Sequence, residues 1–472
     1  MIPHLQPYPA YKDSGVAWLG DVPEHWEVHR LKSKVANLVD QTATRETGEL
    51  YVRLEDVESW TGRYRPPEDD VEFDSQVKRF RPDDVLFGKL RPYLAKVIRP
   101  TESGVCVGEF LVLRTRSTDL HPGYLEQSLR SRPFIGLVDS STFGAKMPRA
   151  DWGFIASVAF PFPSRDEQAA IVRFLDYVGR RVRRYVRAKR RLIDLLNEQK
   201  QAVIQRAVTR GLDPTVRLKP SGVDWLGDIP KHWEVMALRF RYMVELGKML
   251  DTKRITGEHL VPYLRNVDVR WDEIRTDDLP EMDVGADEYA RYTLEKGDLL
   301  VCEGGEVGRA AIWGGSIRLI AYQKALHRVR PINGSGDQPR YLMFVLETAA
   351  SRGVFLAEGS ENTFAHLTSE KLRRHRFAFP PPNEQKVIVE CIDEALIGLT
   401  ESESLVKNEM ELITEYRTRL IADVVTGKLD VREAAAALPD EPDEELGEVS
   451  EDAELGDELE EELEMVAEEV EA

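Results

Sequence analysis

The chain contains one sequence unit twice, and this repeat restricts its possible folds more than any other feature does. The segment SGVAWLGDVPEHWEVHRL from Ser14 and the segment SGVDWLGDIPKHWEVMAL from Ser221 agree at 13 of 18 positions, at an offset of 207. FPFPSRDEQAAIVRFLD from Phe160 matches FAFPPPNEQKVIVECID from Phe377 at an offset of 217. The order of the matches is kept while the offset grows, so the insertions lie in the middle of each copy. The chain therefore predicts two similar but unequal structural units.

Each copy has the pattern of a body with mixed strands and helices, followed by one helix. Short β-rich runs such as VLFG, VCVGEFLVLR and SVAFPFP alternate with Gly, Pro and Asp breaks, which is typical of short strands joined by turns. After the last run, Ser164 is placed to cap a helix, and Glu167 is placed to complete a capping box. In the second copy three prolines precede Asn383, another favoured cap residue. The sequence thus predicts an α+β fold in which each body ends in a helix.

Apolar residues continue from both caps in alternating steps of four and three, the pattern of a coiled coil. The first run contains Ile171, Leu175, Val178, Val182, Tyr185, Leu192, Leu196 and Val203. The second run contains Ile388, Ile392, Ala395, Leu399, Val406, Ile413, Tyr416 and Leu420. Each helix of about 40 residues would be roughly 60 Å long at 1.5 Å per residue. We expect the two helices to pair antiparallel, with the bodies at opposite ends related by a pseudo-twofold axis. A parallel homodimeric coiled coil is the alternative.

The charge of the chain is concentrated in its C-terminal segment. The whole chain has a net charge of −19, and residues 438–472 contain 18 acidic and no basic residues, which leaves −1 on residues 1–437. The near-neutral body is therefore compatible with binding of a polyanion. An acidic block of this kind is usually disordered, and repulsion of DNA or docking of a partner are the alternative roles.

The sequence contains no pattern of a secreted, membrane-spanning or zinc-binding protein. No run approaches the roughly 20 apolar residues that a membrane span requires, and the segment MIPHLQPYPAYKD does not resemble a signal peptide. Cys106, Cys302 and Cys391 are far apart and form no CxxC pair, so neither a disulfide framework nor a zinc site is indicated. We expect a cytoplasmic protein.

Two unequal bodies at a fixed distance are suited to bind a linear ligand that carries two different recognition elements. Duplex DNA is such a ligand, and the separation of DNA-reading elements is commonly matched to the spacing of half-sites. Because the middles of the two copies diverge, we expect a bipartite and asymmetric recognition site, with the helices acting as a ruler.

Several motifs then resemble one known family. The phrase YKDSGVAWLGDVPEHW from Tyr11, FGKLRPYLAKV from Phe87, GDLLVCEGGEVGRAA from Gly297 and the two P-x-x-x-EQ helix starts are similar to specificity subunits of type I restriction–modification systems. The resemblance covers about residues 8–433 and leaves out the acidic segment. It implies two α/β target recognition domains, each reading one half-site of double-stranded DNA. It also implies two helical regions that set the spacer and bind two methyltransferase subunits, with restriction (translocase) subunits joining afterwards.

On this resemblance the chain divides into five parts. These are a first target recognition domain at 1–163 with the repeat motif at 11–31, a first spacer helix at 164–211 (central conserved region), a second recognition domain at 212–381, a second spacer helix at 382–433 (C-terminal conserved region) and the acidic tail at 434–472.

Candidate DNA contacts lie in matched segments of the two bodies, where side chains can reach base edges and phosphates. In the first body they are Lys89, Arg91, Lys146 and Arg149. In the second body they are Gly305, Arg309, Lys324, His327, Arg328, Asn362 and His366. The alternative role of Arg91 is an ion pair with a local carboxylate or a cap on a carbonyl group. The alternative for the glycine-rich loop around Gly305 is a turn that contacts no phosphate.

Arginines also crowd the first helix. Arg180, Arg183, Arg184, Arg187, Arg190 and Arg191 are the candidates for a face that follows spacer DNA or docks a methyltransferase, with a solvated or salt-bridged face as the alternative. The recurring pairs Trp18/Trp26 and Trp225/Trp233 favour a structural role, because they are present in both copies.

Known catalytic motifs are absent from the sequence. It has no GxxxxGK[ST] loop and no Asn/Asp-Pro-Pro-aromatic element, so ATP hydrolysis and methyl transfer are expected of partners. We expect a non-catalytic subunit that binds no cofactor or metal itself, while its partners use S-adenosylmethionine, ATP and Mg²⁺. The alternatives are a self-contained DNA nuclease or methyltransferase with an unrecognised active site, and a coiled-coil scaffold that does not bind DNA.

Overall fold

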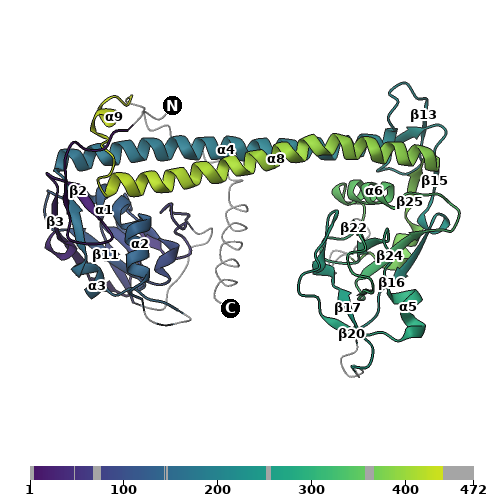
Figure 1. The fold of residues 1–472 in the computed structure, drawn as a ribbon, viewed down its shortest axis with the longest axis horizontal. Helices are drawn as coiled ribbons and strands as arrows, with labels where there is room; N and C mark the ends of the chain where they lie inside the picture. The colour runs from purple at the N-terminus through teal and green to yellow at the C-terminus, as the bar shows by residue number, and fades with distance from the viewer. Residues whose placement is uncertain are drawn as a thin grey trace. The chain divides into compact units, whose positions relative to one another are not determined.

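The computed structural model describes residues 5–46, 48–66, 76–142, 144, 147–250, 257–356 and 366–439. The chain forms two compact units: unit 1 comprises Met1–Arg184 with Ile413–Ala472, and unit 2 comprises Tyr185–Leu412. Each unit contains one β-rich body, called here the first head and the second head (Figure 1). The expected α+β class is confirmed. The acidic residues 440–472 lie outside the described residues.

The first head is built on two four-stranded sheets (Figure 1). The first sheet is antiparallel, in the order β4 (Val35–Leu38), β11 (Phe110–Thr115), β8 (Val85–Gly88) and β9 (Val97–Ile98). The second sheet has the order β5 (Gln41–Thr42), β7 (Val77–Phe80), β10 (Gly104–Cys106) and β6 (Leu50–Val52), with β10 and β6 parallel. The two-stranded pairs are β1 (Tyr11–Asp13) with β2 (Asp21–Pro23) and β3 (Glu27–Arg30) with β12 (Ala159–Phe162). The short helices are α1 (Pro122–Leu129), α2 (Arg132–Asp139) and α3 (Trp152–Ser157).

The second head has the same main sheet and a different second sheet. Its main sheet is antiparallel, in the order β16 (Tyr242–Leu246), β24 (Leu326–Pro331), β21 (Leu299–Cys302) and β22 (Ala310–Ile312). Its second sheet has three strands, β20 (Glu281–Asp283), β17 (Leu260–Leu264) and β23 (Ala321–Tyr322). The two-stranded pairs are β13 (Leu218–Pro220) with β14 (Asp228–Pro230), β15 (Glu234–Ala237) with β25 (Arg376–Phe379), and β18 (Val269–Arg270) with β19 (Glu273–Ile274). The short helices are α5 (Tyr289–Tyr292), α6 (Pro339–Ser351) and α7 (Ser369–Arg374).

Both heads have a core between the main sheet and the second sheet, and the second head has another core between its main sheet and α6. Strands β8 and β21 are buried along their whole length, and α6 buries most of its apolar residues in the same core as Leu299 and Val329. Ion pairs repeat as well: Arg114 Nη2 lies 2.6 Å from Asp84 Oδ2, and Arg330 Nη2 lies 2.7 Å from Asp298 Oδ2. The sequence repeat is therefore also a repeat of contacts, and the heads differ mainly in the second sheet.

Two long helices follow the heads: α4 (Arg165–Arg210) and α8 (Pro382–Val425). In unit 2, Lys189 pairs with Glu409 at 2.6 Å and Lys200 pairs with Glu403 at 2.5 Å. Because the partner number falls as the lysine number rises, the helices run antiparallel, as expected (Figure 1). The chain thus supplies its own helical partner, which removes the need for a parallel homodimer.

Each head holds the start of one long helix and the end of the other. Tyr124 of α1 donates its hydroxyl to Pro161 O at 3.1 Å and to Val425 O, at the end of α8, at 3.3 Å. In unit 2, Tyr341 of α6 does the same with Ala378 O at 3.0 Å and with Val208 O, near the end of α4, at 3.4 Å.

The helix starts differ in detail from the expectation. Ser164 Oγ accepts the N–H of Glu167 at 3.3 Å, but the carboxylate of Glu167 turns toward Trp26 and does not close a capping box. The expected cap at Asn383 is wrong, because α8 already begins at Pro382 and the N–H groups of Glu384 and Gln385 donate to Pro381 O. A proline at the first helical position loses no hydrogen bond, so this start is favourable.

Most of the buried heptad residues lie near the heads, and Val406 in the middle of α8 is buried as well. Ile171, Val178, Ile388 and Ile392 are buried, whereas Tyr185 and Leu192 are exposed in the middle of α4. Burial of the heptad residues therefore depends on packing against the heads as much as on pairing of the two helices.

Candidate nucleic-acid interface

In the first head, a strained loop after β8 is held by two other segments. The N–H of Lys89 donates to Glu109 O at 2.9 Å, and the N–H groups of Ala150 and Arg91 donate to Lys89 O and Pro148 O at 2.8 Å each. Arg91 has a left-handed φ of 48°, and such strain in a non-glycine residue is common at functional sites. We call this set of backbone hydrogen bonds the loop frame.

The side chains on the first loop frame form a small charged cluster. Lys89 Nζ lies 3.9 Å and Arg149 Nε 3.3 Å from Glu109 Oε2, and Arg149 is 45% exposed. These pairs are partly exposed and long, and therefore weak, so a DNA base or phosphate can replace the carboxylate as partner. Glu109 was not a sequence candidate. It is recognised only from the pairing of the two segments.

The second head contains the same loop frame with other side chains on it. The N–H of Glu303 donates to Ala325 O at 2.9 Å, and the N–H of Leu367 donates to Glu303 O at 2.8 Å. Glu303 thus occupies the position of Lys89, and Ala325 that of Glu109. His366, which precedes Leu367, occupies the position of Arg149. The two heads present opposite charge at the same point of the same frame.

The glycine-rich loop of the second head is held against Asn266. Asn266 Nδ2 donates to Gly304 O at 3.1 Å, and Arg309 Nη2 donates to Asn266 O at 2.9 Å. A side chain at residue 304 would meet the ring of His366 at 3.3 Å, and Gly305 has a left-handed φ of 70°. This close approach explains the two glycines. Lys324 is exposed on the neighbouring turn.

Two candidate DNA contacts of the second head, His327 and Arg328, are buried. His327 is fully buried, and its Nε2 lies 2.7 Å from Leu367 O, while burial lowers the pKa of the ring. Arg328 is 3% exposed and donates to Ala290 O at 3.1 Å and to the carboxylate of Glu245. These contacts favour a supporting role. Lys146 and Asn362 lie outside the described residues.

The arginines of α4 are mostly exposed. Arg181, Arg184, Arg187 and Arg191 are exposed, and Arg180 and Arg190 are half-buried. Arg191 lies 3.9 Å from Glu198, a weak pair at the surface. The helix therefore presents guanidinium groups to solvent over several turns.

The recurring tryptophans have a structural role in both heads. Trp26 and Trp233 are fully buried, and each donates its Nε1–H to a glutamate of a helix start, Glu167 or Glu384, at 3.0 Å. His25 and His232 contact the same two carboxylates at 2.9 and 2.7 Å. The glutamate of the P-x-x-x-EQ motif thus ties the repeat motif to the helix. We call each of these contacts a helix-start lock.

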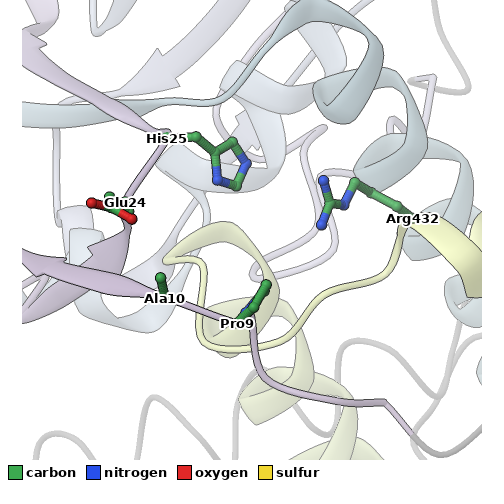
Figure 2. A pocket seen from close by; sticks show the side chains of 5 residues that line it. All are labelled: Pro9, Ala10, Glu24, His25 and Arg432. Carbon is green, nitrogen blue, oxygen red and sulfur yellow. The ribbon is translucent and has the colours of Figure 1, made fainter.

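A hollow beside the first lock is lined by Pro9, Ala10, Glu24, His25 and Arg432. Figure 2 shows His25 and Arg432 on opposite sides of it. Both are engaged elsewhere: His25 with Glu167, and Arg432 Nη2 with Asp430 Oδ2 at 2.6 Å. Two of the titratable groups that line the hollow, those of His25 and Arg432, are therefore already paired.

Within the described ranges, no group of three or more His, Cys, Asp or Glu residues is placed to hold a metal ion. The helices in the part of the chain that the structure covers are also too short or too polar to cross a membrane.

Comparison with known proteins gives matches of one kind. The family model described as "Type I restriction modification DNA specificity domain" matches residues 230–412. The MjaVIII type I restriction enzyme specificity subunit of Methanocaldococcus jannaschii is 21% identical over 344 residues, which are 70% of this chain and 76% of that protein. The EcoDI specificity subunit of Escherichia coli is 23% identical over 163 residues, which are 33% of this chain and 35% of that protein.

A solved structure agrees with the fold. It comes from work on complex assembly and conformational transition of the type I R-M system. It covers 86% of this chain and 99% of its own, with a TM-score of 0.68 and 17% identity. The chain is thus similar to the specificity subunits of type I restriction–modification enzymes, through the matched family model over residues 230–412 and through the curated relatives.

Proposed function

We propose that this chain is the DNA sequence-recognition subunit of a type I restriction–modification complex, in which each head reads one half of a bipartite, asymmetric site. The observation that carries the proposal is the loop frame, which is present twice with different side chains on it. One frame with two side-chain sets is what a reader of two different half-sites needs.

The residue types on the frames suit contact with base edges in the major groove. In the first head, Lys89 and Arg149 are donors of the kind that bind guanine O6 and N7. In the second head, Glu303 is an acceptor of the kind that binds the cytosine amino group. The glycine loop with Gly305 and Arg309 suits a phosphate, because its backbone is open to close approach.

The long helices are proposed to set the spacer and to dock two methyltransferase subunits. On α8, the apolar side chains of Ile397, Leu405 and Leu412 are 58%, 65% and 65% exposed. They lie seven or eight residues apart, so they form one stripe along the helix. An exposed apolar stripe is typical of a protein–protein interface, and a methyltransferase is the partner we propose for it.

Catalysis is proposed to reside in the partners. The methyltransferase subunits would use S-adenosylmethionine, and the restriction subunits would use ATP and Mg²⁺. In this division of labour residues 1–163 and 212–381 are the recognition domains, 164–211 and 382–433 are the spacer helices, and 434–472 are the tail.

Co-expression tests the proposal directly. The chain is expressed with a type I methyltransferase subunit from the same genome, and the methylated motifs of the host DNA are mapped. We expect one split, asymmetric motif, and exchange of residues 31–160 for another head should change only one half of it. Methylation or Mg²⁺-dependent cleavage by the purified chain alone, or a motif that is unaffected by the exchange, would contradict the proposal.

A further inference from the structure

Arginines from three segments of unit 1 lie within electrostatic range of a shared neighbour, because Arg183 interacts with both Arg63 and Arg417. Arg63 lies on the loop after β6, Arg183 on α4 and Arg417 on α8. Burial, together with the charges of Arg130 and Arg183, lowers the pKa of Arg417 to about 10. Arg63 and Arg130 in turn lie within electrostatic range of Arg183. We call Arg63, Arg183 and Arg417 the arginine cluster.

The carboxylates around the cluster are already engaged. Glu58 faces Arg417 but pairs with Arg65 at 3.9 Å, and Glu126 pairs with Arg130 at 2.9 Å. Asp176 accepts a hydrogen bond from Gln127, and burial raises its pKa, which favours its neutral form. Among the described residues, the buried Nε of Arg417 has no hydrogen-bond partner. In the part of the chain that the structure describes, the arginines that act on the cluster therefore outnumber the carboxylates that face it, Glu58 and Asp176.

The loop that carries Arg63 is fixed in place by close packing. Gly62 has a left-handed φ of 67°, and a side chain there would overlap both Arg130 Nη1 and Val97 O at 2.1 Å. Arg130 is itself held by a hydrogen bond to Val97 O at 3.0 Å, and Arg132 stacks over Trp60 at 5.8 Å. The cluster is thus built into the fold before any ligand arrives.

We propose that Arg63, Arg183 and Arg417 form an anion site that binds a phosphodiester group of the duplex DNA backbone. Guanidinium groups match phosphate oxygens with paired hydrogen bonds, and a phosphate supplies the charge that the cluster lacks. The inference rests on the proposed function and extends it, because it gives the long helices direct contact with DNA. Such contact fixes register and carries no sequence information.

The proposed site predicts that replacement of Arg417 raises the unfolding temperature and lowers the affinity for DNA. Arg417→Met removes a crowded like charge, so the variant should unfold at a higher temperature than the wild type in phosphate-free buffer. The same variant should bind every DNA sequence about 3- to 10-fold more weakly, and the slope of log Kd against log salt should fall by roughly 1. Arg419→Met, two residues later on α8 and paired only with Glu415, is the matched control and should change neither quantity.

Binding is measured by fluorescence anisotropy on the full chain with its methyltransferase. Inorganic phosphate is the separate probe, and it should raise the unfolding temperature of the wild type more than that of Arg417→Met. Lower stability of Arg417→Met with an unchanged salt slope would overturn the inference. If the wild type fails to bind DNA at all while phosphate still stabilises it through the cluster, then the proposed function fails and the anion site remains.

The acidic tail is the rival occupant of the cluster. Arg173 of α4 donates to Leu438 O at 3.0 Å, so the tail starts beside the helix that carries Arg183. In a chain without residues 440–472, Arg417→Met should still reduce the salt slope. If the tail occupies the cluster, the variant and the wild type will bind DNA equally in that background, and the inference is wrong.

Discussion

At the scale of single residues, the difference between Lys89 and Glu303 is central to the proposed function. Both residues make the same pair of backbone hydrogen bonds, so the change of charge alters what can be bound at this point of the frame. Glu303 is half-buried and lies beside the exposed His366. In the proposed role, a carboxylate at this point would select a base with an exocyclic amino group and reject a base with only acceptors there.

Replacement of Glu303 tests this directly. Glu303→Gln can donate as well as accept, so it should relax recognition at one position of one half-site, by roughly 1–3 kcal/mol or about 10- to 100-fold. The measurement is the methylated motif of cells that express the variant with its methyltransferase. Glu370→Gln on the exposed end of α7 is the control and should keep the wild-type motif. A change in the other half-site, or none, would count against a reading role of Glu303.

Another residue in the second head makes stability depend on pH. Burial and the nearby Asp272 raise the pKa of Glu347 on α6 from 4.5 to about 7, with Arg340 opposing the shift and Glu306 adding to it. Between these two values the unfolded chain releases the proton while the folded chain keeps it, so stability falls as pH rises and levels off above pH 7.

Glu347→Gln should remove this pH dependence. At pH 8 the variant should be more stable than the wild type by about 2 kcal/mol, and near pH 4 the two should be alike. Chemical denaturation of both chains across this pH range measures the difference between their free energies of unfolding. The contributions of other titrating groups, such as His327, cancel in this difference. A constant gap between the two chains at all pH values would show that Glu347 does not titrate in this range.

At the scale of elements, the helix-start locks connect the heads to the long helices. Glu167 accepts from Trp26 and, in addition, from the hydroxyl of Tyr8 at 2.7 Å, whereas the partners of Glu384 within the described ranges are Trp233 and His232. The two locks should therefore differ in strength although the sequence motif is the same.

Removal of each carboxylate should reveal this difference. Glu384→Ala leaves the buried Trp233 N–H without a partner and should cost about 1–3 kcal/mol, and Glu167→Ala should cost more because Tyr8 is left unpaired too. Hydrogen exchange of β3 and β12 in unit 1, and of β15 and β25 in unit 2, measures the two effects separately. Equal loss of protection in both units would contradict an added contribution of Tyr8.

The elements also show how far the sequence predicts the structure. The repeat and the heptads predict two heads and two long helices correctly, because such patterns depend on local periodicity. The match of DVLFGK from Asp84 with DLLVCE from Asp298 already pairs Lys89 with Glu303 in the sequence. Recognition of Glu167 as a lock was not possible, because it depends on contacts between segments distant in the chain. The cap at Asn383 was predicted wrongly, since the prolines before it are themselves able to start the helix.

At the scale of the whole molecule, the proposed ruler follows from the antiparallel pairing of α4 and α8. A lengthened helix keeps its pairing only if its partner is lengthened equally, because Lys189 with Glu409 and Lys200 with Glu403 fix the register. Seven residues are close to two helical turns, so their insertion preserves the face that each helix presents.

Insertion of seven residues into both helices, between the two lysines on α4 and between the two glutamates on α8, should add about 10 Å of helix. At about 3.4 Å per base pair this corresponds to roughly three more base pairs in the unread spacer. Both half-sites should stay the same, which mapping of the methylated motif will show. Insertion into α4 alone shifts the lysines away from their glutamates and should abolish methylation instead of lengthening the spacer. If the single insertion lengthens the spacer as the double insertion does, then each helix acts independently, and the paired ruler is wrong.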